Sequence, residues 1–143
     1  MHKIIMVTFL LLGLSSCAST RYGNFAEAPS KYNQKMAADT VYQLVNIYPP
    51  ATTKFNFQQE TGDVFGETLM EKLRDSGYAV VELNKDESSS GSTHRDKTLS
   101  YIVDLQMTNL YRITILIGDE TLSRAYVVQN NLLYPAGSWV YKE

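Results

Sequence analysis

Cys17 is the residue of this 143-residue chain whose setting is best suited to chemistry, and it is the only cysteine. It follows a leucine and two serines and closes an apolar stretch, residues 4–12, that comes after Lys3. A basic start, a short apolar segment and small residues before a cysteine are typical of a bacterial lipoprotein signal. The apolar stretch is too short to span a bilayer of roughly 30 Å as a helix. We therefore expect residues 1–16 to be a signal peptide and Cys17 to be the lipidation site.

The alternative for Cys17 is an ordinary secretory signal with a leftover thiol. A lone cysteine in a secreted protein invites pairing between molecules, and lipidation removes that reactivity. Ala18 stands where an aspartate favours inner-membrane retention in enteric bacteria, so we expect an outer-membrane lipid anchor that faces the periplasm. Each buried methylene contributes about 0.8 kcal/mol, and more than one acyl chain gives stable anchoring. The membrane, reached through acylated Cys17, is the first expected partner.

No catalytic set assembles elsewhere in the chain. After cleavage the remaining histidine is His94, in a serine-rich segment, so a Ser-His-Asp arrangement has no credible base. Zinc sites need clustered histidines and cysteines, which this sequence does not provide. The carboxylates that an acid–base pair would need are interpreted as solvated strand or turn residues: Glu82, Asp104, Asp119 and Glu120. We expect no enzymatic activity, no metal and no cofactor.

Composition narrows the classes of partner. The chain has 13 basic and 15 acidic residues, and loss of Lys3 with the signal changes the net charge from −2 to −3. Without a basic cluster, direct contact with nucleic acid is not expected. Removal of 16 residues leaves a length that suits one domain with a core and no disulfides. Ten tyrosines suit half-buried strand positions and also protein interfaces.

Periodicity predicts two helices and two short strands before the middle of the chain. The first helix covers residues 31–48, is capped by Ser30 and ends at two prolines. The second covers residues 63–76 and ends at Gly77, where a left-handed conformation is needed. Alternating strands at residues 53–58 and 78–83 flank it and form a βαβ-like unit. We expect a tether at residues 17–30 and a flexible loop at residues 84–98, which has no large apolar residue.

The remaining chain predicts a β-meander whose register follows from its turns. Gly118-Asp119 is a two-residue hairpin signal that pairs Ile117 with Glu120 and Ile113 with Arg124. A turn at Asn130-Asn131 likewise pairs Val128 with Leu133. Arg124 then projects toward the isoleucine face, either as a strand-end side chain that reaches water or as a buried anchor for a partner carboxylate. The residues leave both alternatives open.

The strand at residues 99–107 needs a different connection to the next strand. A two-residue turn would set Leu105 beside Arg112, on the wrong face. A three-residue loop, 108–110, instead sets Val103 opposite Ile115, and we predict that loop. Pro135 predicts that the last strand lies at an edge or breaks there, and we expect Trp139 and Tyr141 to pack.

These elements predict an α+β fold with two layers, in which two helices pack on a mostly antiparallel sheet of about six short strands. The domain organisation is a signal peptide at 1–16, a lipidated N-terminus and tether at 17–30, and a single periplasmic domain at 31–143, with the loop 84–98 inside it.

Five segments stand out between about residue 41 and the end of the chain: Tyr48-Pro49-Pro50-Ala51, Gly77-Tyr78-Ala79-Val80, Leu110-Tyr111-Arg112-Ile113-Thr114, Leu122-Ser123-Arg124-Ala125-Tyr126 and Pro135-Ala136-Gly137-Ser138-Trp139-Val140-Tyr141-Lys142-Glu143. In this order, they resemble the TrbH family of conjugal-transfer lipoproteins. Such lipoproteins help to tie the core complex of a type IV secretion channel to the outer membrane.

The resemblance implies a structural or accessory subunit of a mating-pair-formation apparatus, with other secretion-channel core proteins as partners. Only Cys17 carries over as a residue with a stated role. The alternative from another class is an envelope lipoprotein that binds a small ligand or a cell-envelope polymer. It requires a concave apolar pocket, here a deep cleft lined by tyrosines, whereas a filled core with a flat exposed edge favours the subunit.

Overall fold

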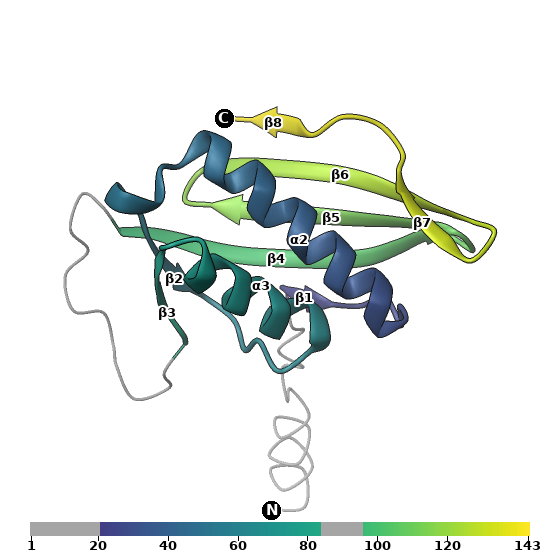
Figure 1. The fold of residues 1–143 in the computed structure, drawn as a ribbon, viewed down its shortest axis with the longest axis horizontal. Helices are drawn as coiled ribbons and strands as arrows, with labels where there is room; N and C mark the ends of the chain where they lie inside the picture. The colour runs from purple at the N-terminus through teal and green to yellow at the C-terminus, as the bar shows by residue number, and fades with distance from the viewer. Residues whose placement is uncertain (1–20, 84–95) are drawn as a thin grey trace, which may run out of the picture.

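Two helices lie side by side across one face of a mixed sheet in the computed structural model, which describes residues 21–83 and 96–143 (Figure 1). The helices are α2, Ser30–Ile47, and α3, Val64–Asp75, with the 3-10 turn η2, Pro50–Thr52, between them. The strands are β1, Gly23–Asn24; β2, Lys54–Phe57; β3, Ala79–Val81; β4, Asp96–Met107; β5, Leu110–Ile117; β6, Glu120–Gln129; β7, Leu132–Pro135; and β8, Val140–Lys142. The predicted α+β class is confirmed, with eight strands in place of about six.

Helix α2 forms because apolar side chains recur at helical spacing along it, and these are buried against the sheet: Met36, Ala37, Val41 and Leu44. Its start differs from the prediction. The N-cap is Pro29, in an extended conformation with no side-chain cap, and Ser30 is already helical. Proline suits this position because its fixed φ leads into the first turn.

Helix α3 begins and ends with strong local signals. The Asp63 carboxylate accepts hydrogen bonds from the backbone N–H groups of Phe65 and Gly66, so it is an N-cap with two partners. After the helix, Gly77 has a φ of 93° in the left-handed region, as its position in the sequence predicted. Strand β3 then returns parallel to β2 and directly beside it, which confirms the βαβ unit.

The sheet has the strand order β3-β2-β4-β5-β6-β7, with β1 also paired to β4 and β8 to β6. The pairs β1–β4, β2–β3 and β2–β4 are parallel, and the others are antiparallel. Because β4 is 12 residues long, it pairs with β2 along its first half and with β1 along its second half. The core lies between this sheet and the two helices.

Both predicted two-residue hairpins are confirmed. Ile117 pairs with Glu120 and Ile113 with Arg124, and Val128 pairs with Leu133. The φ angles of Asn130 and Asn131 are 49° and 60°, the positive values that a tight hairpin turn of this kind requires. The resulting alternation buries the inward residues of the meander, including Ile113, Ile115, Ile117 and Leu122.

The connection between β4 and β5 corrects the predicted three-residue loop. Met107 pairs with Leu110, so the turn has only two residues, and Val103 lies opposite Ile113 rather than Ile115. A β-bulge between Leu105 and Met107 allows the two-residue turn while Tyr111 and Ile113 of β5 stay buried. One extra residue in a strand shifts the alternation of faces by one, which removes the conflict that the prediction solved with a longer loop.

The C-terminal segment follows the prediction in part. Strand β7 ends at Pro135 on the sheet edge, and Trp139 packs against the core. Tyr141 is wrongly predicted to pack, since it is 43% exposed. Two lysines of α2 cover carbonyls at the β7 end: Lys31 Nζ donates to Asn131 O at 3.2 Å and Lys35 Nζ to Leu133 O at 2.6 Å.

Part of the expected tether packs on the domain. Gly23 and Asn24 pair with β4, the Phe25 N–H donates to Val103 O at 2.8 Å, and Ala26 is buried. Of the expected loop at 84–98, residues 84–95 lie outside the described residues and the last three begin β4.

Candidate functional site

The predicted site residues do not converge in the described chain. Cys17 and His94 lie outside the described residues. Asp119 is exposed in its turn, and Glu82 pairs with Arg74 across 2.9 Å. Asp104 makes a bidentate pair with Arg112, at 3.2 Å and 2.6 Å, so these groups are surface charges, as interpreted from the sequence.

Glu120 differs from that interpretation, because it is partly buried and accepts a short hydrogen bond from the Tyr48 hydroxyl. Lys97 Nζ lies 3.8 Å from the same oxygen of Glu120. The hydrogen bond from Tyr48 is the main cause that lowers the pKa of Glu120. Burial, followed by the contact with Glu120, raises the pKa of Tyr48. The two side chains tie the end of α2 to the start of β6.

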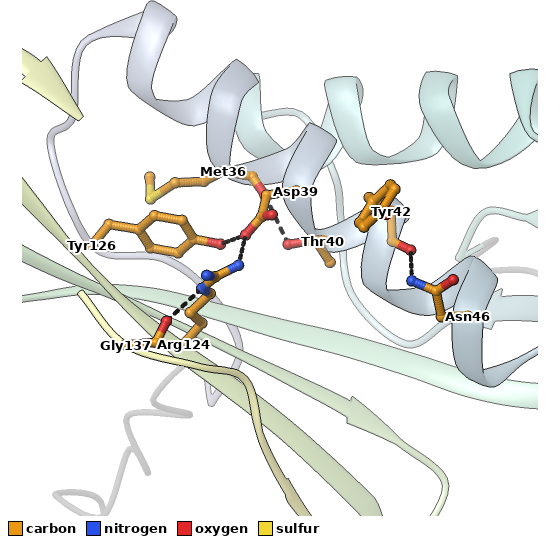
Figure 2. Close-up of polar contacts among 8 residues, drawn as sticks. All are labelled: Met36, Asp39, Thr40, Tyr42, Asn46, Arg124, Tyr126 and Gly137. Atoms are coloured by element: carbon orange, nitrogen blue, oxygen red, sulfur yellow. Dashed lines mark hydrogen bonds and ion pairs between the residues drawn. The ribbon is translucent and has the colours of Figure 1, made fainter. Parts of the chain in front are cut away.

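Arg124 pairs with a carboxylate of the same chain. Of the two alternatives left open by the sequence, the structure therefore shows the carboxylate pair. Arg124 Nη1 lies 2.8 Å from Asp39 Oδ2 on α2, and its Nε donates to Gly137 O at 3.0 Å (Figure 2). The Tyr126 hydroxyl donates to the same Asp39 oxygen at 2.5 Å. The guanidinium also lies over the Trp139 ring, 5.9 Å from its centroid. This cluster joins α2, β6 and the C-terminal segment.

A second carboxylate cluster forms around Asp63. Besides capping α3, Asp63 accepts from the Tyr101 hydroxyl and, at 3.1 Å, from Asn24 Nδ2. Asn24 also donates to Asn33 Oδ1 at 3.0 Å. Burial, followed by the contact with Asp63, raises the pKa of Tyr101. These contacts join β1, α2, α3 and β4, and the sequence pattern had not singled out any of them.

Both carboxylate clusters join separate elements of the fold through hydrogen bonds from buried tyrosines. Each tyrosine is buried, and its raised pKa keeps the hydroxyl protonated, so it donates a hydrogen bond and is a poor nucleophile. Within residues 21–83 and 96–143, no group of three histidine, cysteine, aspartate or glutamate side chains could hold a metal ion. The same residues contain no helix long and apolar enough to cross a membrane.

In the described part of the chain, six of the ten tyrosines are buried in the core and none lines a deep cleft: Tyr32, Tyr48, Tyr78, Tyr101, Tyr111 and Tyr126. The surface depressions have volumes of about 350 to 390 Å³ and open widely to solvent. One of them lies between α2 and α3, where Tyr42 is 72% exposed. The largest buried aromatic side chains belong to the packed interior instead: Tyr101, Tyr126, Phe55, Phe57 and Phe65.

The face of the sheet that the helices leave uncovered carries a row of apolar side chains. Register places Met107, Leu110, Val127 and Tyr134 side by side across β4, β5, β6 and β7. Their neighbours Tyr111, Tyr126 and Leu133 are buried on the helix side, so alternation directs Met107, Leu110 and Val127 to the opposite face. We call this surface the helix-free face. Tyr134 lies on the edge strand, where Lys35 Nζ of α2 is 5.6 Å from its ring centroid.

Taken together, the fold and these clusters define a small α+β domain that is held together by buried tyrosine–carboxylate contacts. The chain belongs to the TrbH family, because the family model described as conjugal transfer protein TrbH matches residues 19–143. It is therefore a conjugal transfer protein, and the resemblance found in the sequence is confirmed. The search of curated proteins gave no match, and neither did the search of solved structures.

Proposed function

We propose that the protein is an outer-membrane lipoprotein that acts as a structural or accessory subunit of a conjugative type IV secretion apparatus. The observation that carries this proposal is the family match over residues 19–143, directly after a lipoprotein signal that ends at Cys17. Acyl chains on Cys17 hold the protein in the membrane, and Ala18 directs it to the outer membrane. The domain itself faces the periplasm.

The proposed organisation has three parts. Residues 1–16 are removed as a signal peptide, Cys17 and the residues up to Tyr22 form a short lipidated leader, and the domain follows. The domain acts through contact with other channel proteins and not through catalysis. Its packed core and its exposed apolar side chains support that mode of action.

The mechanism is multivalent. Lipid confines the domain to one surface, which raises its effective concentration toward other membrane-bound subunits, so weak protein contacts are sufficient for assembly. The lipid anchor fixes where the protein lies in the apparatus, and the domain provides the specific interface.

The test replaces the acylated residue. Cys17→Ser is expected to leave the domain folded, release it from membranes into the periplasmic fraction and lower conjugation frequency by at least about tenfold, because the effective-concentration gain is lost. Ala18→Ser is the matched control and keeps both lipid and transfer. Ala18→Asp shifts the protein to the inner-membrane fraction. Undiminished transfer by the unlipidated form contradicts the proposal.

A further inference from the structure

The position of β1 limits how far the domain can stand from the lipid. Gly23 pairs with Ile102, and Asn24 is held by hydrogen bonds to Asn33 and Asp63. Between Cys17 and Gly23, even a fully extended chain reaches only about 20 Å. A domain of this size is roughly 35 Å across. If Cys17 is acylated, the surface next to β1 therefore lies against or close to the membrane.

Phe25 directly follows β1 in the chain and is an exposed aromatic residue. Since Asn24 directs its side chain toward the helices, the alternation of a strand directs Phe25 to the helix-free face. A Cβ atom on Gly23, on the same face, would lie 3.7 Å from the Phe25 ring. Phe25 is 55% exposed, so a large apolar ring points outward within a few residues of the proposed anchor.

Other apolar side chains on the helix-free face are exposed as well. Met107 is 68% exposed. Val140, which pairs with Ser123, is also exposed on this face. Ile102 is half-buried beside Thr114, and the paired Asp104 and Arg112 lie between that row and the row of Met107. Exposed apolar side chains that gather on one face are typical of an interaction site for protein or membrane.

Charge distinguishes the two sides of the domain. The charges on the helix-free side of β2, β4 and β5 occur as pairs: Lys54 with Asp96, at 3.2 Å, and Arg112 with Asp104. The exposed sides of the helices carry more charges, of which Arg74 is paired with Glu82: Lys31, Lys35, Glu67, Glu71, Arg74 and Asp75. Moving a surface with paired charges and outward apolar side chains to the headgroup region costs less desolvation free energy, because fewer ions lose their hydration.

We propose that the helix-free face rests on the lipid surface to which Cys17 is anchored, with Phe25 and Met107 at the headgroup–acyl boundary. This rests on the proposed lipidation and adds an orientation to it. The sheet lies next to the membrane, and α2 and α3 face the periplasm. Figure 1 shows that the helices cover the opposite face, so their outer surface is turned away from the lipid.

The experiment uses the full-length lipoprotein in vesicles of phosphatidylethanolamine with a minor fraction of phosphatidylglycerol. Acylation consumes the only native thiol, so Met107→Cys and Tyr42→Cys each add one site for an environment-sensitive fluorophore. The two positions are 68% and 72% exposed and lie on opposite faces. Spin-labelled phospholipid is expected to quench the label at position 107 at least about twofold more than the label at 42, since interfacial groups lie at headgroup depth.

Two further variants test the contact itself. Phe25→Asp in the Met107→Cys background is expected to reduce quenching, whereas Val45→Asp on α2, 39% exposed, leaves it unchanged. Mass spectrometry of the same samples reports the acyl group. Equal quenching at 107 and 42 with Cys17 acylated overturns the orientation alone, and so does protection of position 107 that depends on protein density, which indicates a second copy. An unmodified Cys17 overturns both proposals.

Discussion

Asp63 and Asp39 each accept a hydrogen bond from a buried tyrosine, but the two carboxylates are satisfied in different ways. Asp63 has two backbone N–H donors, an asparagine amide and the Tyr101 hydroxyl. Asp39 has the Arg124 guanidinium and the Tyr126 hydroxyl. The first arrangement uses backbone dipoles fixed by a helix end, and the second uses a side-chain cation.

The difference follows from where each cluster lies. Asp63 belongs to the half of the domain that holds β1, where four elements meet and fixed donors are available. Asp39 lies on the middle of α2, facing β6 and the C-terminal segment, with 26% of its side chain and 19% of that of Arg124 exposed. Since water can replace part of a half-exposed ion pair, we expect the Asp63 cluster to contribute more to stability than the Asp39 cluster.

The largest expected effect comes from Gly66→Ala, beside Asp63. The added Cβ would lie 2.2 Å from the Tyr101 hydroxyl and 3.0 Å from the backbone of Thr61. Tyr101 must move away from Asp63, so we expect a loss of about 3 kcal/mol in the free energy of unfolding. Gly62→Ala, with nothing within 4 Å, is the control and stays within about 0.5 kcal/mol. Equal urea midpoints for both variants would show that the contact is not tight.

Removing each carboxylate compares the clusters directly. Asp63→Ala removes a helix cap and leaves buried donors without a partner, so we expect a loss of about 2 kcal/mol. Asp39→Ala leaves Arg124 able to reach water, and we expect about 1 kcal/mol. Chemical denaturation of both variants measures the difference. A larger loss for Asp39→Ala reverses the ranking of the two clusters.

Alkaline pH is expected to lower the stability of both halves of the domain. Burial raises the pKa of Tyr78 to about 12, and it also raises those of Tyr101 and Tyr126. In the unfolded chain a tyrosine has a pKa of about 10. The stabilisation is therefore complete below about pH 10 and is lost as the pH rises toward 12. Tyr78→Phe should weaken this dependence in denaturation curves recorded across that range, and an unchanged dependence would exclude Tyr78 as a contributor.

The smallest effect on stability is expected at the edge next to the Asp39 cluster. Lys35→Ala removes the bond to Leu133 O and the contact with the Tyr134 ring, but on a partly exposed surface this changes stability by less than about 0.5 kcal/mol. It does uncover an edge carbonyl, so we expect more self-association in sedimentation velocity. Gln34→Ala, one residue earlier and exposed, serves as the reference that remains monodisperse.

The meander was predictable because its turns determine its pairing. Gly118-Asp119 and Asn130-Asn131 each allow only a two-residue connection, and alternation then places every side chain on a face. The bulge between Leu105 and Met107 was not predictable, because no residue type marks an extra strand residue. Strand β1 was missed for a related reason. Two residues show no alternation, and their partner lies about 80 positions away.

The clusters were predictable only in part. The register placed Arg124 on the inward face and left open whether it reaches water or pairs with a carboxylate, and the carboxylate that it pairs with lies 85 residues earlier on a helix. Asp63 was expected only within a helix start, because the sequence does not reveal that Asn24 and Tyr101 converge on it. Cys17 differs from both, because a lipoprotein signal is a linear motif that does not depend on the fold, and its lipidation stays a prediction.

The pairing of β1 with β4 also determines how the molecule responds to tension. Any pull applied to the chain before Arg21 reaches Gly23 and Asn24 first, and only afterwards the helices. Detaching that two-residue strand would release the segment up to Pro29 and lengthen the free chain before α2 by roughly 20 Å. The side-chain amide of Asn24, which donates to Asn33 and Asp63, is therefore among the first contacts that such a force must break.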